Sequence, residues 1–376
     1  MKLLLGGIPL GYDNIGDEAI LACVVKMLRD SVPGVELTVA TSDPQTAERL
    51  GVQTVPPFGF KDKPVSWQIN ADAFTNLVRK FDAYIWCGAT GLSDYPNDAL
   101  DLLELAQATG TPTFVWGVGM DDELNPVFFR AHGKRRLLLK LFGLTGWYER
   151  HLRERLKRRI ATILPQCHGV WVRDPQSAAM LASMGFDGAG VTADTAILMA
   201  PQQEKKPHGS AKRLGLCIST QRQVADLDGV RKMIADVRQS GAEIIGIPMN
   251  PKTDKPLLES LGVECISGTS PEEVVAAAGE CDAVLSSRLH LLILAANAGT
   301  PGLGIARGSK LQNWLSNFGR TVEGSVYECD WEKVTRHVLA QLADRGEWDK
   351  TREAAYAALM ARFTKAREDF IGRLPK

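Results

Sequence analysis

The stretch KLLLGGIPLGYDNIGDEAILACVVKMLR, residues 2–29, contains the local pattern that decides the fold. It begins with an apolar run, Lys2–Ile8, which is too short for a signal peptide and is typical of a first β-strand. A glycine-containing turn follows, and the spacing of apolar residues predicts a helix over Glu18–Arg29. The stretch therefore predicts the first strand, turn and helix of a βαβ unit.

Short apolar runs alternate with helical patterns along the rest of the chain, which predicts parallel, doubly wound sheets. The expected strands are Lys2–Ile8, Glu36–Thr41, Gln53–Val55, Ala83–Trp86, Thr113–Gly117, Val170–Val172, Arg213–Ser219, Glu243–Pro248, Glu264–Ser267, Ala283–Ser286 and Gly302–Ile305. The polar, proline-containing stretch Pro201–Lys212 interrupts the alternation and is interpreted as a linker. The fold class is therefore α/β, with two Rossmann-like domains facing each other across a cleft at the carboxyl ends of their strands.

A chain of 376 residues is long for one hydrophobic core, which favours more than one domain. We expect an N-terminal Rossmann-like domain over 1–205 and a C-terminal Rossmann-like domain over 212–335. The remaining segment, 336–376, is expected to be helical and to pack back on the first domain.

The bulk composition excludes several classes of protein. Lysine plus arginine and aspartate plus glutamate both number 44, so no global positive field favours nucleic acid as a partner. The seven cysteines include no Cys-x-x-Cys pair, which indicates neither a zinc site nor a disulfide framework. No run of eighteen apolar residues is present, so a membrane span is not predicted and a cytoplasmic protein is expected.

The segment from Arg130 to Arg159 departs from this neutral average because it is strongly basic and contains interleaved leucines and aromatic residues. One interpretation is one or two surface helices with a solvated basic face. The alternative is an interfacial patch that rests on anionic lipid, at the inner face of the cytoplasmic membrane, or on an acceptor diphosphate.

The first group of candidate site residues is Asn14, Gly16 and Asp17, where the first strand gives way to a helix. Backbone N–H groups at such a turn can approach an anion, and the helix N-terminus adds a partial positive charge. Helix capping is an equally good explanation for Asn14 and Asp17.

The second group is Arg173, at another strand-to-helix junction, and Asp194, after the next apolar run. An arginine at this position can reach an anionic ligand, whereas a surface ion pair between Arg173 and Asp174 is the structural alternative.

The third group is Ser287, Arg288 and His290, followed by Arg307 and Lys310. An imidazole suits proton transfer at neutral pH, and three nearby cations suit a phosphate or carboxylate. This is the most informative part of the sequence.

Together these motifs resemble the polysaccharide pyruvyl transferase family. The similar pieces are Asn14–Leu21, Val172–Ser177, Thr192–Asp194 and Arg288–His290 with the Gly-x-Pro and Lys310 that follow, and they occur in the family's order. Two departures are a less glycine-rich stretch at Cys87–Asp94 and the basic segment at about 130–160, which looks like an insertion.

The resemblance implies a GT-B-like fold and an enzyme that transfers pyruvate from phosphoenolpyruvate to two hydroxyls of one sugar in a cell-surface polysaccharide precursor. The product is a cyclic ketal, phosphate is released, and no further cofactor or metal is required. The first domain is then the acceptor side and the second the donor side. The sugar, its lipid or nucleotide carrier, and the oligomeric state are left open.

The resemblance assigns His290 as general acid or base, with Arg173, Arg288 and Lys310 as the clamp for the donor's carboxylate and phosphate. Ser287 and Arg307 are expected to bind the donor as well. Asn14, Gly16, Asp17 and Asp194 are expected in an acceptor-side loop, with Asp17 or Asp194 as base toward the sugar.

Two alternatives remain at this stage. A glycosyltransferase that uses a nucleotide sugar fits the same architecture, and the fold alone does not separate it from a pyruvyl transferase. A non-catalytic family member that binds a glycan or scaffolds an assembly is favoured only by the weakened glycine stretch.

Overall fold

The computed structural model describes residues 1–7, 14–41, 44–56, 58, 67–94, 96–122, 124, 129–131, 133–200, 211–219 and 224–375. The chain forms two compact units. Unit 1 comprises Met1–Gly11, Val24–Asp194 and Arg362–Lys376, and unit 2 comprises Tyr12–Cys23 and Thr195–Ala361. Each unit contains its own parallel sheet.

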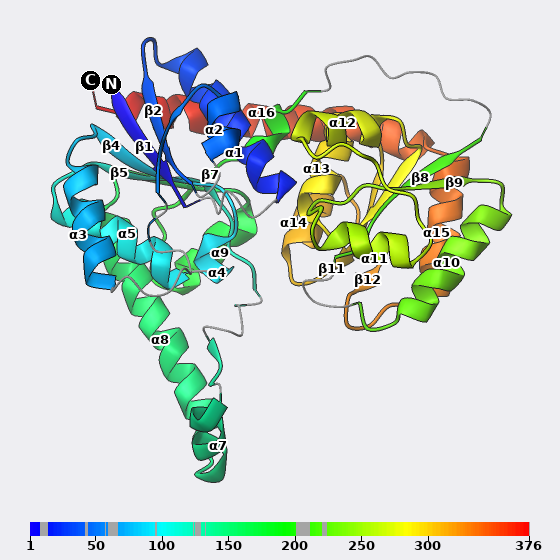
Figure 1. Ribbon diagram of the computed structural model, residues 1–376, viewed down its shortest axis with the longest axis horizontal. Coiled ribbons are helices and arrows are strands. Elements are labelled where there is room, and N and C mark those ends of the chain that lie inside the picture. Colours follow the sequence, from blue (N-terminus) through cyan, green and yellow to red (C-terminus); the bar gives the residue numbers. More distant parts are fainter. Residues whose placement is uncertain are drawn as a thin grey trace. The chain divides into compact units, whose positions relative to one another are not determined.

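Unit 1 is built on a parallel sheet with the strand order β3-β2-β1-β4-β5-β6-β7 (Figure 1). Its strands are β1 (Lys2–Gly6), β2 (Glu36–Ala40), β3 (Gln53–Val55), β4 (Ala83–Cys87), β5 (Thr113–Val118), β6 (Gly169–Val172) and β7 (Gly190–Val191). Every residue of β4 and β5 is buried, which explains why these strands are apolar without alternation. The order of the first six strands is that of a dinucleotide-binding Rossmann sheet.

Helices cover both faces of this sheet. The helices of this unit are α2 (Pro44–Arg49), α3 (Trp67–Val78), α4 (Gly91–Asp94), α5 (Pro96–Ala108), α7 (Gly133–Leu141), α8 (Thr145–Ile163), the 3-10 helix η1 (Leu164–Gln166) and α9 (Pro175–Ser183). Of these, α7 has no buried residue and does not pack on the sheet. The last turns of α16 (Gly346–Arg373) also belong to unit 1, where Phe363 and Phe370 pack against Trp116. Helix α1 (Ile15–Ser31) and α16 each contribute residues to both units.

Unit 2 contains a parallel sheet with the order β12-β11-β10-β8-β9. Its strands are β8 (Arg213–Cys217), β9 (Glu243–Gly246), β10 (Ala283–Ser286), β11 (Gly302–Ala306) and β12 (Gly324–Ser325). Its remaining helices are the 3-10 helix η2 (Thr195–Leu198), α10 (Leu227–Gln239), α11 (Asp254–Ser260), α12 (Pro271–Gly279), α13 (Leu289–Asn297), α14 (Lys310–Ser316) and α15 (Trp331–Ala343). The strand order reverses between β8 and β10, which is the position where doubly wound sheets bind ligands.

The core of unit 2 follows from helical periodicity. The buried residues of α10 are Val230, Met233, Ile234 and Val237, an i, i+3, i+4, i+7 stripe that packs on the sheet. Helix α13 is buried at every position except His290. A polar ring at the start of an otherwise buried helix indicates a site rather than packing.

The α/β fold with two Rossmann-like units is confirmed. One predicted strand is wrong: Glu264–Ser267 makes only an isolated bridge between Gly246 and Cys265. The chain turns away there because Ser270 and Glu273 form a capping box that starts α12. Most of the expected linker, Pro201–Lys212, lies outside the described residues.

The units divide the chain differently from the expected domain ranges 1–205, 212–335 and 336–376. Residues 12–23 belong to unit 2 because the start of α1 is hydrogen-bonded there, through Ile15 N and Met249 O. Of the C-terminal helical segment, only the part from Arg362 onward belongs to unit 1.

The loop after β4 contains an unusual backbone conformation. Ala89 has a φ of 60°, in the left-handed region that glycine adopts without strain, and it follows Gly88 with a φ of 59°. The Ala89 carbonyl nevertheless accepts a hydrogen bond from Gly119 N at 2.8 Å, which joins this loop to the end of β5. In the stretch Cys87–Asp94, Ala89 therefore has a backbone conformation that is typical of glycine.

Ala89→Gly should stabilise the protein by about 1 kcal/mol, because it removes a left-handed alanine. Urea unfolding measures the change. Gly110→Ala is the matched control: its φ is 78° and an added Cβ meets nothing within 4 Å, so the strain alone should destabilise the protein. A loss of stability in Ala89→Gly, as in an ordinary alanine-to-glycine change, would contradict the strained conformation.

Candidate functional site

The opening motif folds against the loop that follows β9. The amide of Ile15 donates to the carbonyl of Met249 at 2.9 Å, and Asn14 Oδ1 accepts from the amide of Gly16 at 3.3 Å. The side chain of Asn14 also donates to Asp17 Oδ2 at 2.5 Å. Asn14 therefore caps α1 and at the same time holds the Asp17 carboxylate.

Asp17 is buried, with 3% of its surface exposed. Burial raises its pKa from 3.8 to about 6, and the charge of His290, the Asn14 hydrogen bond, Lys310 and Arg288 all act in the opposite direction. A carboxyl with this pKa exchanges its proton near neutral pH. The cations that oppose its protonation come from segments nearly 300 residues away in the sequence.

The imidazole of His290 lies against the backbone of Gly16. A Cβ added at Gly16 would lie 2.1 Å from His290 Nδ1 and 2.4 Å from Cγ, far inside van der Waals contact. Gly16 is therefore needed because a ring occupies the space where any other side chain would begin. His290 is half-buried in the second position of α13.

Arg288 is held in place by a buried carboxylate. Its Nε donates to Asp254 Oδ2 at 3.1 Å and its Nη2 donates to Oδ1 at 2.7 Å, a two-point contact with a fully buried aspartate. Asn250 N also donates to Asp254 Oδ2 at 3.0 Å. The carboxylate thus fixes the guanidinium and the loop after β9 together.

These residues gather at the carboxyl ends of the strands of unit 2, where β8 and β10 adjoin. Ser287 Oγ accepts from the amide of Ser219 at 2.9 Å, which joins the two strand ends at the point of order reversal. Arg307 follows β11, and Lys310 is the first residue of α14. The N-termini of α1, α13 and α14 add partial positive charge to these cations.

Arg173 and Asp194 lie in unit 1, at the carboxyl ends of β6 and β7. Arg173 Nε donates to Asp174 Oδ2 at 3.2 Å, and its Nη1 is 3.8 Å from Asp194 Oδ2. The pair with Asp174 expected as a surface alternative does form, but it is buried. Asp174 also caps α9 by accepting from the amide of Ser177.

The guanidinium of Arg173 occupies a space that a glycine leaves. A Cβ at Gly119 would lie 2.5 Å from Arg173 Nη2, and this nitrogen is buried without a hydrogen-bond partner among the described residues. Arg362, from α16, donates through Nε to the carbonyl of Thr192 at 2.7 Å. Burial lowers the pKa of Arg362, and Asp174 opposes that change.

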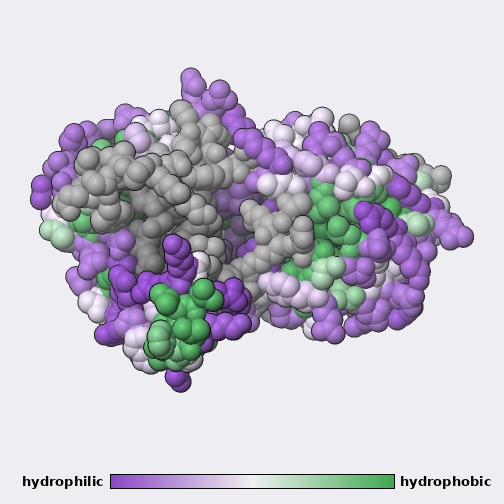
Figure 2. Space-filling model, turned by 60° about the horizontal axis from the view of Figure 1, so that its bottom comes forward, coloured by the Kyte–Doolittle hydropathy of each residue, from purple (hydrophilic) through white to green (hydrophobic). Residues whose placement is uncertain are grey.

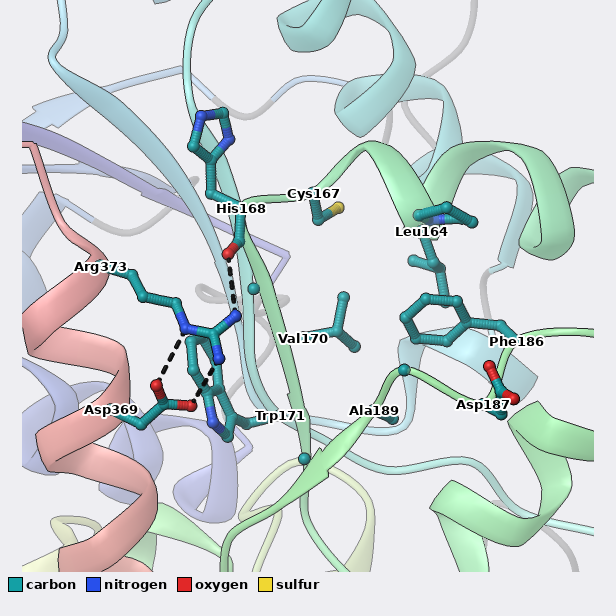
Figure 3. A pocket seen from close by; sticks show the side chains of 14 residues that line it. Leu164, Cys167, His168, Val170, Trp171, Phe186, Asp187, Ala189, Asp369 and Arg373 are labelled. Atoms are coloured by element: carbon teal, nitrogen blue, oxygen red, sulfur yellow. Dashed lines mark hydrogen bonds and ion pairs between the residues drawn. The ribbon is translucent and has the colours of Figure 1, made fainter.

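A separate cavity of about 470 Å³ lies at the amino ends of β6 and β7 (Figure 3). Arg373, which lines it, donates to Asp369 at 2.9 and 3.0 Å and to the carbonyl of His168 at 3.4 Å. None of the candidate site residues lines it. The cavity is therefore at the opposite edge of the sheet from Arg173.

The polysaccharide pyruvyl transferase family model matches residues 14–309. The match begins at the capping residue of α1 and ends one residue before Lys310, so it includes Arg173, Asp194, Arg288 and His290. The chain belongs to the polysaccharide pyruvyl transferase family. It is therefore an enzyme that transfers pyruvyl groups in polysaccharide biosynthesis.

Solved structures place this pyruvyl transferase among the GT-B glycosyltransferases and epimerases by fold. The glycotransferase of kitacinnamycin has a TM-score of 0.61 at 11% identity, with 100% of this chain and 99% of that chain covered. UDP-GlcNAc 2-epimerase from Neisseria meningitidis, bound to UDP-GlcNAc, has a TM-score of 0.58 at 14% identity, covering 97% and 100%. A UGT transferase from Siraitia grosvenorii in complex with UDP has a TM-score of 0.58 at 12% identity, covering both chains fully. Among curated proteins, none matches this sequence.

Eight of the candidate site residues lie in unit 2. Contacts and electrostatic interactions link Asn14, Gly16, Asp17, Arg288, His290 and Lys310, whereas Ser287 and Arg307 lie in the same unit at strand ends. Arg173 and Asp194 form a second cluster in unit 1, and their action on the same donor as His290 stays a prediction. No helix in the described part of the chain is long and apolar enough to cross a membrane.

Three residues of these clusters, Asp254, Arg362 and Gly119, were not predicted from the sequence. Asp254 follows a strand end within the polar run Asn250–Asp254, which was a usable signal. Arg362 has no such signal, because it is one of several arginines in a long helix. Gly119 becomes informative only once the Arg173 guanidinium is seen beside it.

Asp17→Asn should change the pH dependence of stability. The folded pKa of Asp17 is raised, so wild-type stability falls as pH rises from about 4 to about 6, where the buried carboxyl ionises. Asp17→Asn has no carboxyl to ionise, so its free energy of unfolding should not fall in this way. Relative to that of wild type, it should rise by about 2 kcal/mol between pH 4.5 and 7.5.

Urea unfolding at several pH values measures this difference. Asp30→Asn is the matched control, because Asp30 is an exposed carboxylate in the same helix. If the free energies of unfolding of wild type and Asp17→Asn differ by the same amount at every pH, Asp17 is not a buried carboxyl that ionises in this range.

Proposed function

We propose that the enzyme uses phosphoenolpyruvate as donor and forms a cyclic pyruvate ketal on a sugar of a cell-surface polysaccharide precursor. The observation that supports this most is the cluster at the carboxyl ends of the unit 2 strands, where the His290 ring lies against Gly16 and Asp254 fixes Arg288. The charges of His290, Lys310 and Arg288 act on the buried Asp17 carboxyl in this cluster. Such a cluster provides both charge neutralisation and proton transfer.

The reaction needs balanced proton transfers. C3 of the enol gains a proton and becomes a methyl group, and a sugar hydroxyl adds to C2 while losing its proton. Phosphate then leaves C2 with its bridging oxygen, and the second hydroxyl adds there and loses its proton. One of the two hydroxyl protons balances the proton gained by C3, and the other leaves with phosphate.

In our proposal, His290 transfers the proton at C3 or at the attacking hydroxyl, since it is the half-buried polar ring at the site. Arg288 and Lys310 bind the donor's carboxylate and phosphate, and Ser287 and Arg307 add hydrogen-bond donors beside them. The bidentate contact with Asp254 holds the Arg288 guanidinium in one orientation before the donor binds.

Asp17 has a supporting role in this scheme. Only 3% of the Asp17 surface is exposed, so its carboxyl is not accessible to a sugar. In this proposal Asp17 interacts electrostatically with His290 and is not the base that deprotonates the acceptor. Asp194, the other candidate base, is buried beside Arg173, and we propose that it orients that guanidinium.

Transfer from a nucleotide sugar is the second candidate, because similar folds are seen with UDP or UDP-GlcNAc. Incubation with phosphoenolpyruvate in one arm and UDP-sugars in the other separates the two. Acceptor-dependent phosphate release supports the pyruvyl donor, and UDP release supports the alternative.

His290→Ala should reduce acceptor-dependent phosphate release by roughly 10²–10⁴-fold, the usual effect of removing an acid–base group. The matched control is His337→Ala, which removes an exposed histidine paired with Glu323 at 2.5 Å, in the same unit but outside the cluster. Phosphate release is followed with a labelled donor, and ketal formation by mass spectrometry.

The control should keep wild-type activity. If His290→Ala releases phosphate at nearly the wild-type rate with a proven acceptor, the role assigned to His290 is wrong.

A further inference from the structure

The helical pair α7 and α8 exposes a concentrated apolar surface. Its six members, which we call the α7–α8 tip, are Leu137, Leu138, Leu141, Phe142, Leu144 and Trp147, each between 45% and 76% exposed. Only one other large hydrophobic residue, Tyr327, is comparably exposed in the described part of the chain. Figure 2 shows a compact hydrophobic patch there, surrounded by hydrophilic surface.

The tip is held away from the sheet of unit 1. Helix α7 has no buried residue, and the buried residues of α8 are Leu156, Ile160 and Ile163, all in its second half. The first half of α8 therefore extends beyond the core, with α7 at its end (Figure 1). The apolar side chains of α7 contribute nothing to the core, so packing does not explain them.

The charges around the tip are almost all positive. Residues 133–158 contain nine lysines and arginines and only two glutamates, a net charge of +7 in a chain whose total is zero. Exposed cations such as Lys134, Arg136 and Lys140 are interleaved with the leucines of α7. Arg135 stacks over Tyr148 at 4.4 Å, which joins α7 to α8.

We propose that the α7–α8 tip inserts into the surface of an anionic lipid bilayer. Exposed leucines and aromatic residues enter the boundary between headgroups and acyl chains, and surrounding lysines and arginines bind acidic headgroups. A second copy of the chain fits less well, because a two-fold contact through the tip places +7 against +7. This surface binding is independent of the donor chemistry proposed above.

Co-sedimentation of the full-length protein with vesicles tests the proposal. The protein should bind vesicles of phosphatidylcholine with 30% phosphatidylglycerol, bind less as salt rises, and not bind pure phosphatidylcholine. The double variant Leu141→Ser/Phe142→Ser should bind at least about tenfold more weakly. Lys134→Gln/Lys140→Gln should lower the partition coefficient about thirtyfold.

The matched control for charge is Arg79→Gln/Lys80→Gln, two neighbouring exposed cations elsewhere in unit 1. This variant should bind like wild type, and thermal unfolding should show that all variants stay folded, since the tip buries nothing. Absence of binding to phosphatidylglycerol vesicles overturns the proposal, as do tip variants that bind like wild type. A dimer that Leu141→Ser/Phe142→Ser dissociates, without vesicle binding, assigns the tip to a second copy instead.

Discussion

The contact between the His290 ring and the backbone of Gly16 is the constraint on which the candidate site depends. It fixes the start of α1 against the start of α13, although the two residues are 274 positions apart in the sequence. Because glycine leaves room for the imidazole, the next residue, Asp17, is buried within reach of the cations of unit 2. The raised pKa of Asp17 follows from that burial.

The same contact accounts for the assignment of the start of α1 to unit 2. Residues 12–23 belong to unit 2 although they follow the first strand of unit 1. The residues that follow the first strand of unit 1 therefore contribute to the candidate site at the sheet of unit 2. This arrangement places a helix N-terminus, a carboxyl and an imidazole together without requiring them to be near in sequence.

Much of the fold was predictable because apolar runs and helical periodicity are local signals. The strands from Lys2 to Val172 appear within a few residues of their expected ends. The strand expected at Glu264–Ser267 does not form, because strand propensity takes no account of the capping box that begins at Ser270, three residues later. The basic segment was predicted as one or two helices, and the structure has α7 and α8 there, but the sequence alone does not say which side chains the fold leaves exposed.

The candidate site was predictable in its motif residues but not in their partners. Arg288 and His290 stand at a strand end that the sequence marks clearly, whereas Asp254 and Arg362 become relevant only through long-range packing. Burial also changed assigned roles. Asp17 was predicted as a capping residue or as part of the site, and either it or Asp194 as the base toward the sugar; its hydrogen bond from Asn14 and its burial favour a supporting role for it.

A double-mutant cycle between Gly16 and His290 tests the central contact most directly. Gly16→Ala should destabilise the wild-type protein by about 1–3 kcal/mol, because the new Cβ meets the imidazole. In a His290→Gly background, which removes both the ring and the Cβ that would lie 2.7 Å from the new methyl group, the same substitution should cost nothing or stabilise slightly, since alanine favours a helix over glycine. An equal cost of Gly16→Ala in both backgrounds would show that the ring does not occupy that space and would contradict the account.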